Sequence, residues 1–147
     1  MLVQEDVQEQ VIVTETDRQR LQAMIESLRR ALRTVGDPYE TYLRALENNL
    51  GSTSAVPQAD VDADTVTMNS RVCVWDTDSG KCQVLTLAYE ADADPYGENV
   101  SVLTTLGASL LGSRVGDVVE WQTRRGLRRL RIKRILFQPE SAGAFDL

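Results

Sequence analysis

Histidine is absent from this sequence of 147 residues, and cysteine occurs only twice. Without histidine, the chain lacks the commonest general base, the Ser-His and Cys-His nucleophile pairs, and every zinc site with an imidazole ligand. Cys73 and Cys82 are too few for a four-thiolate site. Because they flank a turn-like segment, we expect them on the two arms of one hairpin, as reduced and buried side chains. These absences predict a protein that is not an enzyme and uses no metal, other cofactor or small-molecule substrate.

Long apolar runs are missing as well. No segment approaches the roughly 20 apolar residues that a membrane-spanning helix needs. Residues 1–10 are acidic and lack the basic flank and apolar stretch of a signal peptide. We therefore expect a cytoplasmic protein without a membrane partner.

The net charge of −6 is unevenly distributed. Residues 1–65 hold 6 bases and 12 acids, whereas residues 66–147 hold 10 of each. Within this neutral half, the segment Glu90–Glu98 carries four acids, and the segment Arg124–Arg134 carries seven bases in eleven positions. Such segregation of sign favours a macromolecular partner that has a charge pattern of its own.

Two stretches have the three- and four-residue spacing of apolar side chains that is typical of amphipathic helices. The first spans residues 17–35 and follows a capping-box pair at Thr16 and Gln19. The second spans residues 38–51, with Asp37 in the N-cap position and proline directly after it. Because so few residues join them, the two helices should form an antiparallel hairpin, a short coiled coil with arms of roughly 28 and 20 Å.

The rest of the chain predicts an α+β fold, in which the hairpin precedes an antiparallel β domain with one short helix. Residues 11–13 are a short β-branched run that fits a strand edge. Turn-forming and acidic residues make 51–64 a linker between the hairpin region, 1–50, and the β domain, 65–147. In the β domain the apolar period falls to two, which predicts strands within 65–75, 81–89, 99–105, 117–123 and 127–137, and a helix within 106–117.

The basic segment has two interpretations. Leu130 and Ile132 alternate with bases, so one strand face is apolar and the other basic. A solvated outer face of the sheet is the simpler interpretation, since no aromatic residues interleave with the bases of this segment. The alternative is a weak contact with the phosphates of RNA or DNA, and the candidate residues for it are Arg124, Arg125, Arg128, Arg129 and Arg131.

Three segments, Val66–Val72, Gly107–Asp117 and Gln138–Leu147, resemble the family of the regulator of nucleoside diphosphate kinase, Rnk. That family is similar to the Gre transcript-cleavage factors, GreA and GreB, of bacterial RNA polymerase. The resemblance extends from about Val11 to the C-terminus. It implies a C-terminal domain of FKBP-like fold that docks on RNA polymerase at the rim of the secondary channel, and a coiled coil that points into the channel.

The resemblance also implies a docking loop. In Gre factors, an acidic stretch before the third strand of this domain meets the polymerase. The corresponding positions here are Asp92 and Asp94, with Pro95 and Tyr96 as apolar support. The alternative for this loop is a solvated acidic turn. We do not expect prolyl isomerase activity from the FKBP-like fold, because the aromatic residues of the predicted strands fit core or cover positions.

Asp37 and Glu40 lie at the predicted tip of the coiled coil, where Gre factors carry two acids that help hold a second metal ion in the polymerase site. Asp-Pro-x-Glu is also a common helix start, in which Glu40 would reach back to a free backbone N–H. Because the hairpin is shorter than a Gre coiled coil, we favour the helix start. The sequence therefore predicts a regulator that competes with Gre-type factors and does not itself stimulate cleavage. A nucleic-acid-binding module and a Gre-like cleavage factor are the alternatives.

Overall fold

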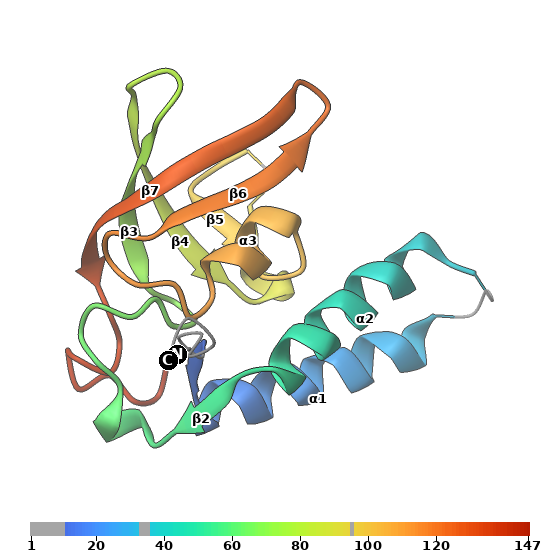
Figure 1. Ribbon diagram of the computed structural model, residues 1–147. Coiled ribbons are helices and arrows are strands. Elements are labelled where there is room, and N and C mark those ends of the chain that lie inside the picture. Colours follow the sequence, from blue (N-terminus) through green and yellow to red (C-terminus); the bar gives the residue numbers. More distant parts are fainter. Residues whose placement is uncertain (1–10, 33–35, 95) are drawn as a thin grey trace, which may run out of the picture.

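The computed structural model describes residues 11–32, 36–94 and 96–147, and it has two parts, a helical hairpin and a curled sheet (Figure 1). The hairpin consists of α1 (Glu15–Ala31) and α2 (Pro38–Gly51). The remaining elements are β1 (Ile12–Thr14), β2 (Ser54–Val56), η2 (Gln58–Asp60), β3 (Arg71–Asp76), β4 (Cys82–Ala88), η3 (Glu90–Asp92), β5 (Asn99–Ser101), α3 (Thr105–Leu110), β6 (Val118–Thr123) and β7 (Gly126–Phe137). The predicted α+β fold, a hairpin followed by a β domain with one short helix, is confirmed.

Helix α1 begins earlier than expected. Its N-cap is Thr14, whose hydroxyl accepts a hydrogen bond from the Asp17 amide at 3.0 Å, so the predicted capping box at Thr16 is wrong. The helix ends at Ala31, and Leu32 is already extended. The predicted continuation through residues 33–35 lies outside the described residues. At about 1.5 Å per residue, α1 is roughly 26 Å long and α2 roughly 21 Å.

Strand β1 confirms the short strand expected near residues 11–13. It pairs in parallel with β2, which lies within the expected linker 51–64. The pairing Val13↔Ala55 therefore holds the start of α1 beside the chain that leaves α2.

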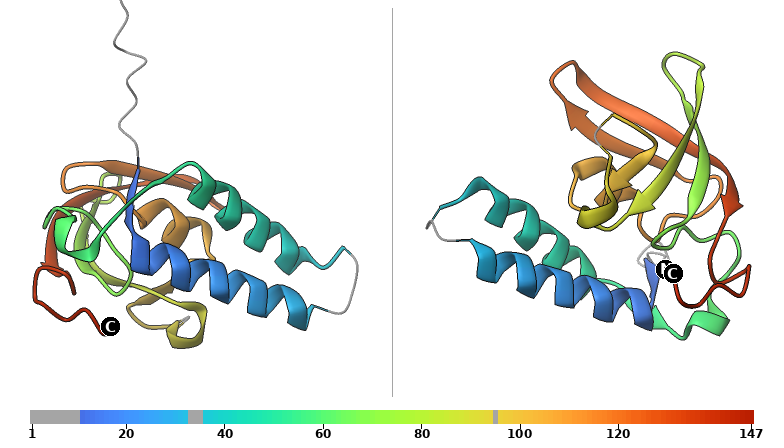
Figure 2. Two further views of the ribbon diagram at one scale, coloured as in Figure 1. Left: turned by 90° about the horizontal axis from the view of Figure 1, so that it is seen from below. Right: turned by 180° about the vertical axis from the view of Figure 1, so that it is seen from behind.

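The main sheet has the strand order β5-β4-β3-β7-β6. Three of its pairings are antiparallel, as expected, and the pairing of β4 with β5 is parallel. Helix α3 packs against β4, β5 and β6, so the sheet curls around it (Figure 2). At Gly107 in α3, an added Cβ would lie 1.9 Å from the carbonyl oxygen of Ser101, so this contact requires glycine.

Strand β7 contains two irregularities. Cys73 and Val74 pair with Arg134 and Ile132, which leaves Lys133 as an extra residue. A second shift near the end of β7 leaves Leu136 extra in the same way. Such bulges place neighbouring side chains on the same face of a sheet.

One hydrophobic core joins the hairpin to the β domain. It contains Leu21, Leu43 and Leu46 from the two helices together with Val72 and Ile132 from the sheet. The hairpin is therefore packed into the fold at its base. Within the described part of the chain, no helix is long and apolar enough to cross a membrane.

The two cysteines lie on the two arms of the β3–β4 hairpin, as predicted. They are free thiols, but Cys82 is exposed and Cys73 is half-buried, so the expectation of a buried pair is wrong. The reason is the period of the strands, which turns Cys73 and Cys82 away from the core side of the sheet.

Candidate functional site

The acidic loop follows β4 and begins with the short helix η3. Its first acid, Glu90, is turned inward: its carboxylate accepts hydrogen bonds from the hydroxyls of Tyr39, at 2.9 Å, and Ser101. Burial and the bond to Glu90 raise the pKa of Tyr39 to about 12. Because Tyr39 lies in the first turn of α2, this bond places the acidic loop and the hairpin on the same side of the molecule.

The predicted docking residues lie on the exposed part of this loop. Asp92 and Asp94 are both exposed, and the Tyr96 side chain is 100% exposed. Pro95 lies outside the described residues. Among the residues that the structure describes, neither aspartate has a basic partner within ion-pair distance.

Hydrogen bonds fix the shape of the exposed loop. The carboxylate of Asp94 accepts from the Tyr96 amide at 3.1 Å, and the Asp94 amide donates to the Asn99 carbonyl at 2.9 Å. The Asn99 side chain donates in turn to the Asp92 carbonyl at 3.1 Å. These bonds hold the backbone of Asp92, Asp94 and Tyr96, and all three side chains are exposed on the surface.

The acids at the start of α2 are engaged within the hairpin. Asp37 is the N-cap, as predicted, and its carboxylate accepts from the Tyr39 amide at 2.8 Å. Glu40 does not reach back to the backbone as expected; it forms an ion pair with Arg29 of α1 at 2.9 Å. Arg29 also pairs with Glu47 at 3.1 Å, and its bonds to Glu40 and Glu47 raise the pKa of its guanidinium.

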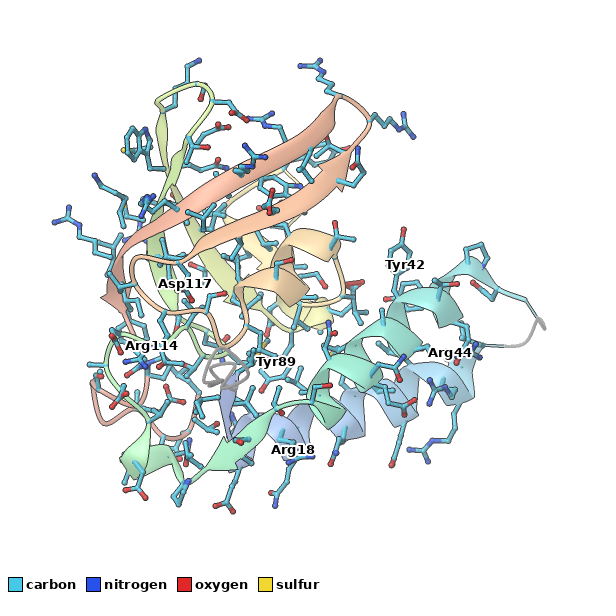
Figure 3. The ribbon with its side chains drawn as sticks, viewed as in Figure 1. Arg18, Tyr42, Arg44, Tyr89, Arg114 and Asp117 are labelled. Atoms are coloured by element: carbon cyan, nitrogen blue, oxygen red, sulfur yellow. The ribbon has the colours of Figure 1, made fainter. Side chains whose placement is uncertain are left out.

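A buried acid, Asp17, joins the hairpin to the β domain. Only 2% of the residue is exposed, and its carboxylate accepts from the Met68 amide at 3.0 Å and the Tyr89 hydroxyl at 3.4 Å. Tyr89 lies at the junction of the two parts (Figure 3). Burial raises the pKa of Asp17 to about 6, although the Met68 amide opposes the shift. Sequence reasoning missed this role; the only local signal was the spacing of Asp17 from Thr14, which matches the start of a capping box.

Asp17 gives a pH dependence that can be tested. The folded pKa is above the ordinary value of 3.8, so its contribution to stability is fully present below pH 3.8 and is lost as pH rises through about 6. The shift corresponds to a loss on the order of 3 kcal/mol. We expect the Asp17→Asn variant, which stays neutral, to gain free energy of unfolding relative to the original protein as pH rises from about 4 to about 7.5. Urea unfolding of both proteins measures this difference, and a constant difference across that range would contradict the assignment.

Several basic side chains of the segment Arg124–Arg134 form ion pairs or hydrogen bonds within the protein. Arg124 and Arg125 form the exposed turn between β6 and β7. Arg128 pairs with Asp76, whose pKa is held below its usual range by the Ser79 amide and by Arg128. The last two candidates, Arg129 and Arg131, are exposed; Arg129 pairs with Glu120 at 2.9 Å, and Arg131 donates to the Gly116 carbonyl at 3.1 Å.

A groove lies between α2 and the β domain. Tyr42 projects from α2 on the side of that domain (Figure 3) and lines the groove together with Leu46, Leu103 and Ser109. The residues of the groove supply no histidine, cysteine or carboxylate, and the described part of the chain contains no cluster of three such groups that could hold a metal ion.

The hairpin and curled β domain define a class of protein with known members. The family model described as "Transcription elongation factor, GreA/GreB, C-term" matches residues 61–137. A solved structure, "Prokaryotic transcription elongation factor GreA/GreB from Nitrosomonas europaea", is 30% identical and has a TM-score of 0.69, with 88% of this chain and 100% of that chain covered. The chain therefore belongs to the GreA/GreB family of transcription elongation factors.

Within this family, the chain resembles one kind of member over nearly its whole length. It is 31% identical to the "Regulator of nucleoside diphosphate kinase" of Escherichia coli K12, over 93% of this chain and 96% of that protein. The "Transcription elongation factor GreA" of Alkaliphilus oremlandii is 32% identical, over 65% of this chain and 60% of that protein. The predicted resemblance to Rnk and to the Gre factors is confirmed, and the chain is a transcription-associated regulator by family.

Proposed function

We propose that this protein is a non-catalytic regulator that binds bacterial RNA polymerase and competes with Gre-type factors. Asp92, Asp94 and Tyr96, with Pro95 between them, dock on a basic surface at the rim of the secondary channel. The hairpin then occupies the mouth of the channel. This function requires no metal, cofactor or small-molecule substrate from the protein itself.

The observation that carries the proposal is the position and state of the acidic loop. Asp92 and Asp94 are exposed without basic partners among the described residues, and the bond of Tyr39 to Glu90 holds their loop beside the hairpin. Exposed charges of one sign mainly steer and orient a partner of opposite charge. A partner that binds the loop therefore also meets the hairpin in one fixed orientation.

The hairpin itself supports regulation without cleavage. A second metal ion in a two-metal site requires carboxylates that are free to coordinate it. Asp37 is committed to the first turn of α2, and Glu40 is committed to Arg29. The arms of roughly 21 to 26 Å also set a short reach for the tip.

The proposal is tested with full-length protein, core polymerase and nuclease in one experiment. We expect the protein to remain bound to polymerase after nuclease treatment, because its contacts are with protein. On backtracked complexes we expect the RNA 3′ end to shorten only at the intrinsic rate of the polymerase. Failure to bind would contradict the docking role, and cleavage above the intrinsic rate would favour the Gre-like alternative.

Two variants distinguish a capping role of Asp37 from a role of its negative charge. Asn still caps a helix but carries no charge, whereas Ala removes the cap at a cost of about 1 kcal/mol. If Asp37 is only a cap, Asp37→Asn should behave like the original protein in polymerase binding. A loss of function that is equal in Asp37→Asn and Asp37→Ala would instead assign a role to the charge.

A further inference from the structure

The sheet face that points away from the core is here called the outer face. It carries basic and aromatic side chains from β3 and β7. Arg131 lies opposite Trp75, and the bulge in β7 exposes both Lys133 and Arg134. Lys133 Nζ lies 5.1 Å from the centre of the Trp75 ring. The second bulge places Phe137, which is 37% exposed, at the end of the same strand.

The positive charge of the outer face is only partly balanced. Two of its neighbouring acids are themselves paired, Glu98 with Arg71 at 3.5 Å and Glu120 with Arg129 at 2.9 Å. A third, Asp78, adds to the effect of Glu120 in raising the pKa of Arg129. In the described part of the chain, no carboxylate lies within ion-pair distance of Arg131, Lys133 or Arg134. Arg131 donates to a neutral carbonyl and Lys133 contacts a neutral ring, so the positive charges of all three residues are not neutralised by an ion pair and can meet an anionic partner.

The aromatic rings indicate which anionic partner fits. Phe137 pairs with Arg71, which is four residues from Trp75 along β3, so the two rings are about 13 Å apart along the sheet. Rings interleaved with cations on an open sheet are the pattern that binds single-stranded nucleic acid, in which unpaired bases stack on the rings. The carboxylates of an acidic protein surface would pair with the cations but would not stack on the rings. The bases of a duplex are already paired and stacked, so a duplex would contact the cations but would not stack on the two rings.

We infer that the outer face binds single-stranded nucleic acid, through phosphates at Arg131, Lys133 and Arg134 and through base stacking on Trp75 and Phe137. The inference stands apart from the polymerase-docking function, because it uses different residues. It also differs from the sequence-based hypothesis of a nucleic-acid contact, which included the turn residues Arg124 and Arg125 and lacked the rings. In the structure, the register of β3 against β7 places the two aromatic rings beside the basic side chains.

Binding is measured by fluorescence anisotropy with short labelled oligouridylate and oligothymidylate, a duplex of the same length, and polyglutamate. We expect both single strands to bind more tightly than the duplex and polyglutamate. With three phosphate contacts, the slope of log K against log salt should be about −2 for a single strand. No binding at low salt, or equal binding of polyglutamate, overturns the inference. A preference between the RNA and DNA strands would show whether the 2′-OH is read.

Two variants with equal charge loss locate the site. Lys133→Gln with Arg134→Gln should weaken single-strand binding by at least about tenfold at about 50 mM salt and reduce the slope to about −0.7. The control, Arg124→Gln with Arg125→Gln, changes two exposed bases in the β6–β7 turn and should leave binding unchanged. All four side chains are exposed, so folding is expected to be retained. An equal loss in both variants overturns the site.

Stacking has a separate spectroscopic readout. The chain has two tryptophans, and Trp121 packs against the core, so Trp121→Phe leaves Trp75 as the only reporter. We expect a bound single strand to quench the fluorescence of Trp75 in this variant. Binding by anisotropy without quenching would show a general polyanion contact and would overturn the stacking role of Trp75.

Discussion

Reversing both exposed carboxylates of the acidic loop, in the Asp92→Lys, Asp94→Lys variant, is expected to weaken binding to core RNA polymerase by at least about tenfold, or about 1.4 kcal/mol. Both side chains are exposed and have no basic partner among the described residues, so the substitution should cost little folding free energy. Its main effect is to place two positive charges against the basic surface that the loop is proposed to meet. Binding is measured by retention of polymerase on the immobilised protein in the presence of nuclease.

Two controls separate charge from loop shape and from net charge. Asp94→Asn keeps an acceptor for the Tyr96 amide but removes the charge, so it should weaken binding less than the double reversal. Asp60→Lys with Asp146→Lys makes the same change in net charge at two exposed positions outside the loop, and it should bind like the original protein. Unchanged binding by the Asp92, Asp94 reversal would show that the loop does not dock.

The sequence predicted the fold well where the signal was local. The helical hairpin follows from apolar spacing, and the start of α2 follows from Asp37 and the proline after it. The N-cap of α1 was predicted two residues too late, because both threonines start a possible capping box. Asp17 follows Thr14 by three residues, and Gln19 follows Thr16 by three residues. Local chemistry alone does not decide between two such candidates.

The features that the sequence did not predict are those set by distant residues. Glu40 has two candidate partners, its own backbone and Arg29, and the approach of α1 selects Arg29. Asp17 has the sequence context of an exposed first-turn acid, yet the β domain covers it and supplies the Met68 amide. The position of Trp75 beside the bases of β7 depends on strand register and a bulge, which a short segment does not specify.

The position of the candidate docking loop came from the resemblance to Gre factors, and the structure adds which of its acids are available. Glu90 is turned toward Tyr39 and Ser101, and Glu98 pairs with Arg71, so the exposed unpaired charge belongs to Asp92 and Asp94. The composition of the segment Glu90–Glu98 does not distinguish these four acids from one another.

Deleting the hairpin is a weak test of its role, because Leu46 and Leu50 share one core with the β domain. Removing residues 1–50 would also remove β1 and the buried Asp17, and would leave the Met68 amide without its partner. A buried donor that loses its acceptor costs about 1–3 kcal/mol. Competition experiments therefore should use the full chain.

Competition with a Gre factor is the second prediction with a large expected effect. If both proteins dock on one surface and place a hairpin in one channel, they cannot bind the same polymerase together. Occupancy then follows mass action, so the amount of this protein needed for half-inhibition should rise in proportion to one plus the ratio of the Gre concentration to its Kd. A factor that bound elsewhere would give a half-inhibition point that does not move with the Gre concentration.

The most direct test is a titration of full-length protein into backtracked complexes that are being cleaved with a Gre factor. We expect cleavage to fall to the intrinsic rate of the polymerase as this protein reaches saturation, and the Asp92→Lys, Asp94→Lys variant to require at least about tenfold more protein. Polymerase binding is recorded in the same samples. Gre-stimulated cleavage that stays unchanged while this protein is fully bound would show that the two sites are distinct and would contradict the proposed function.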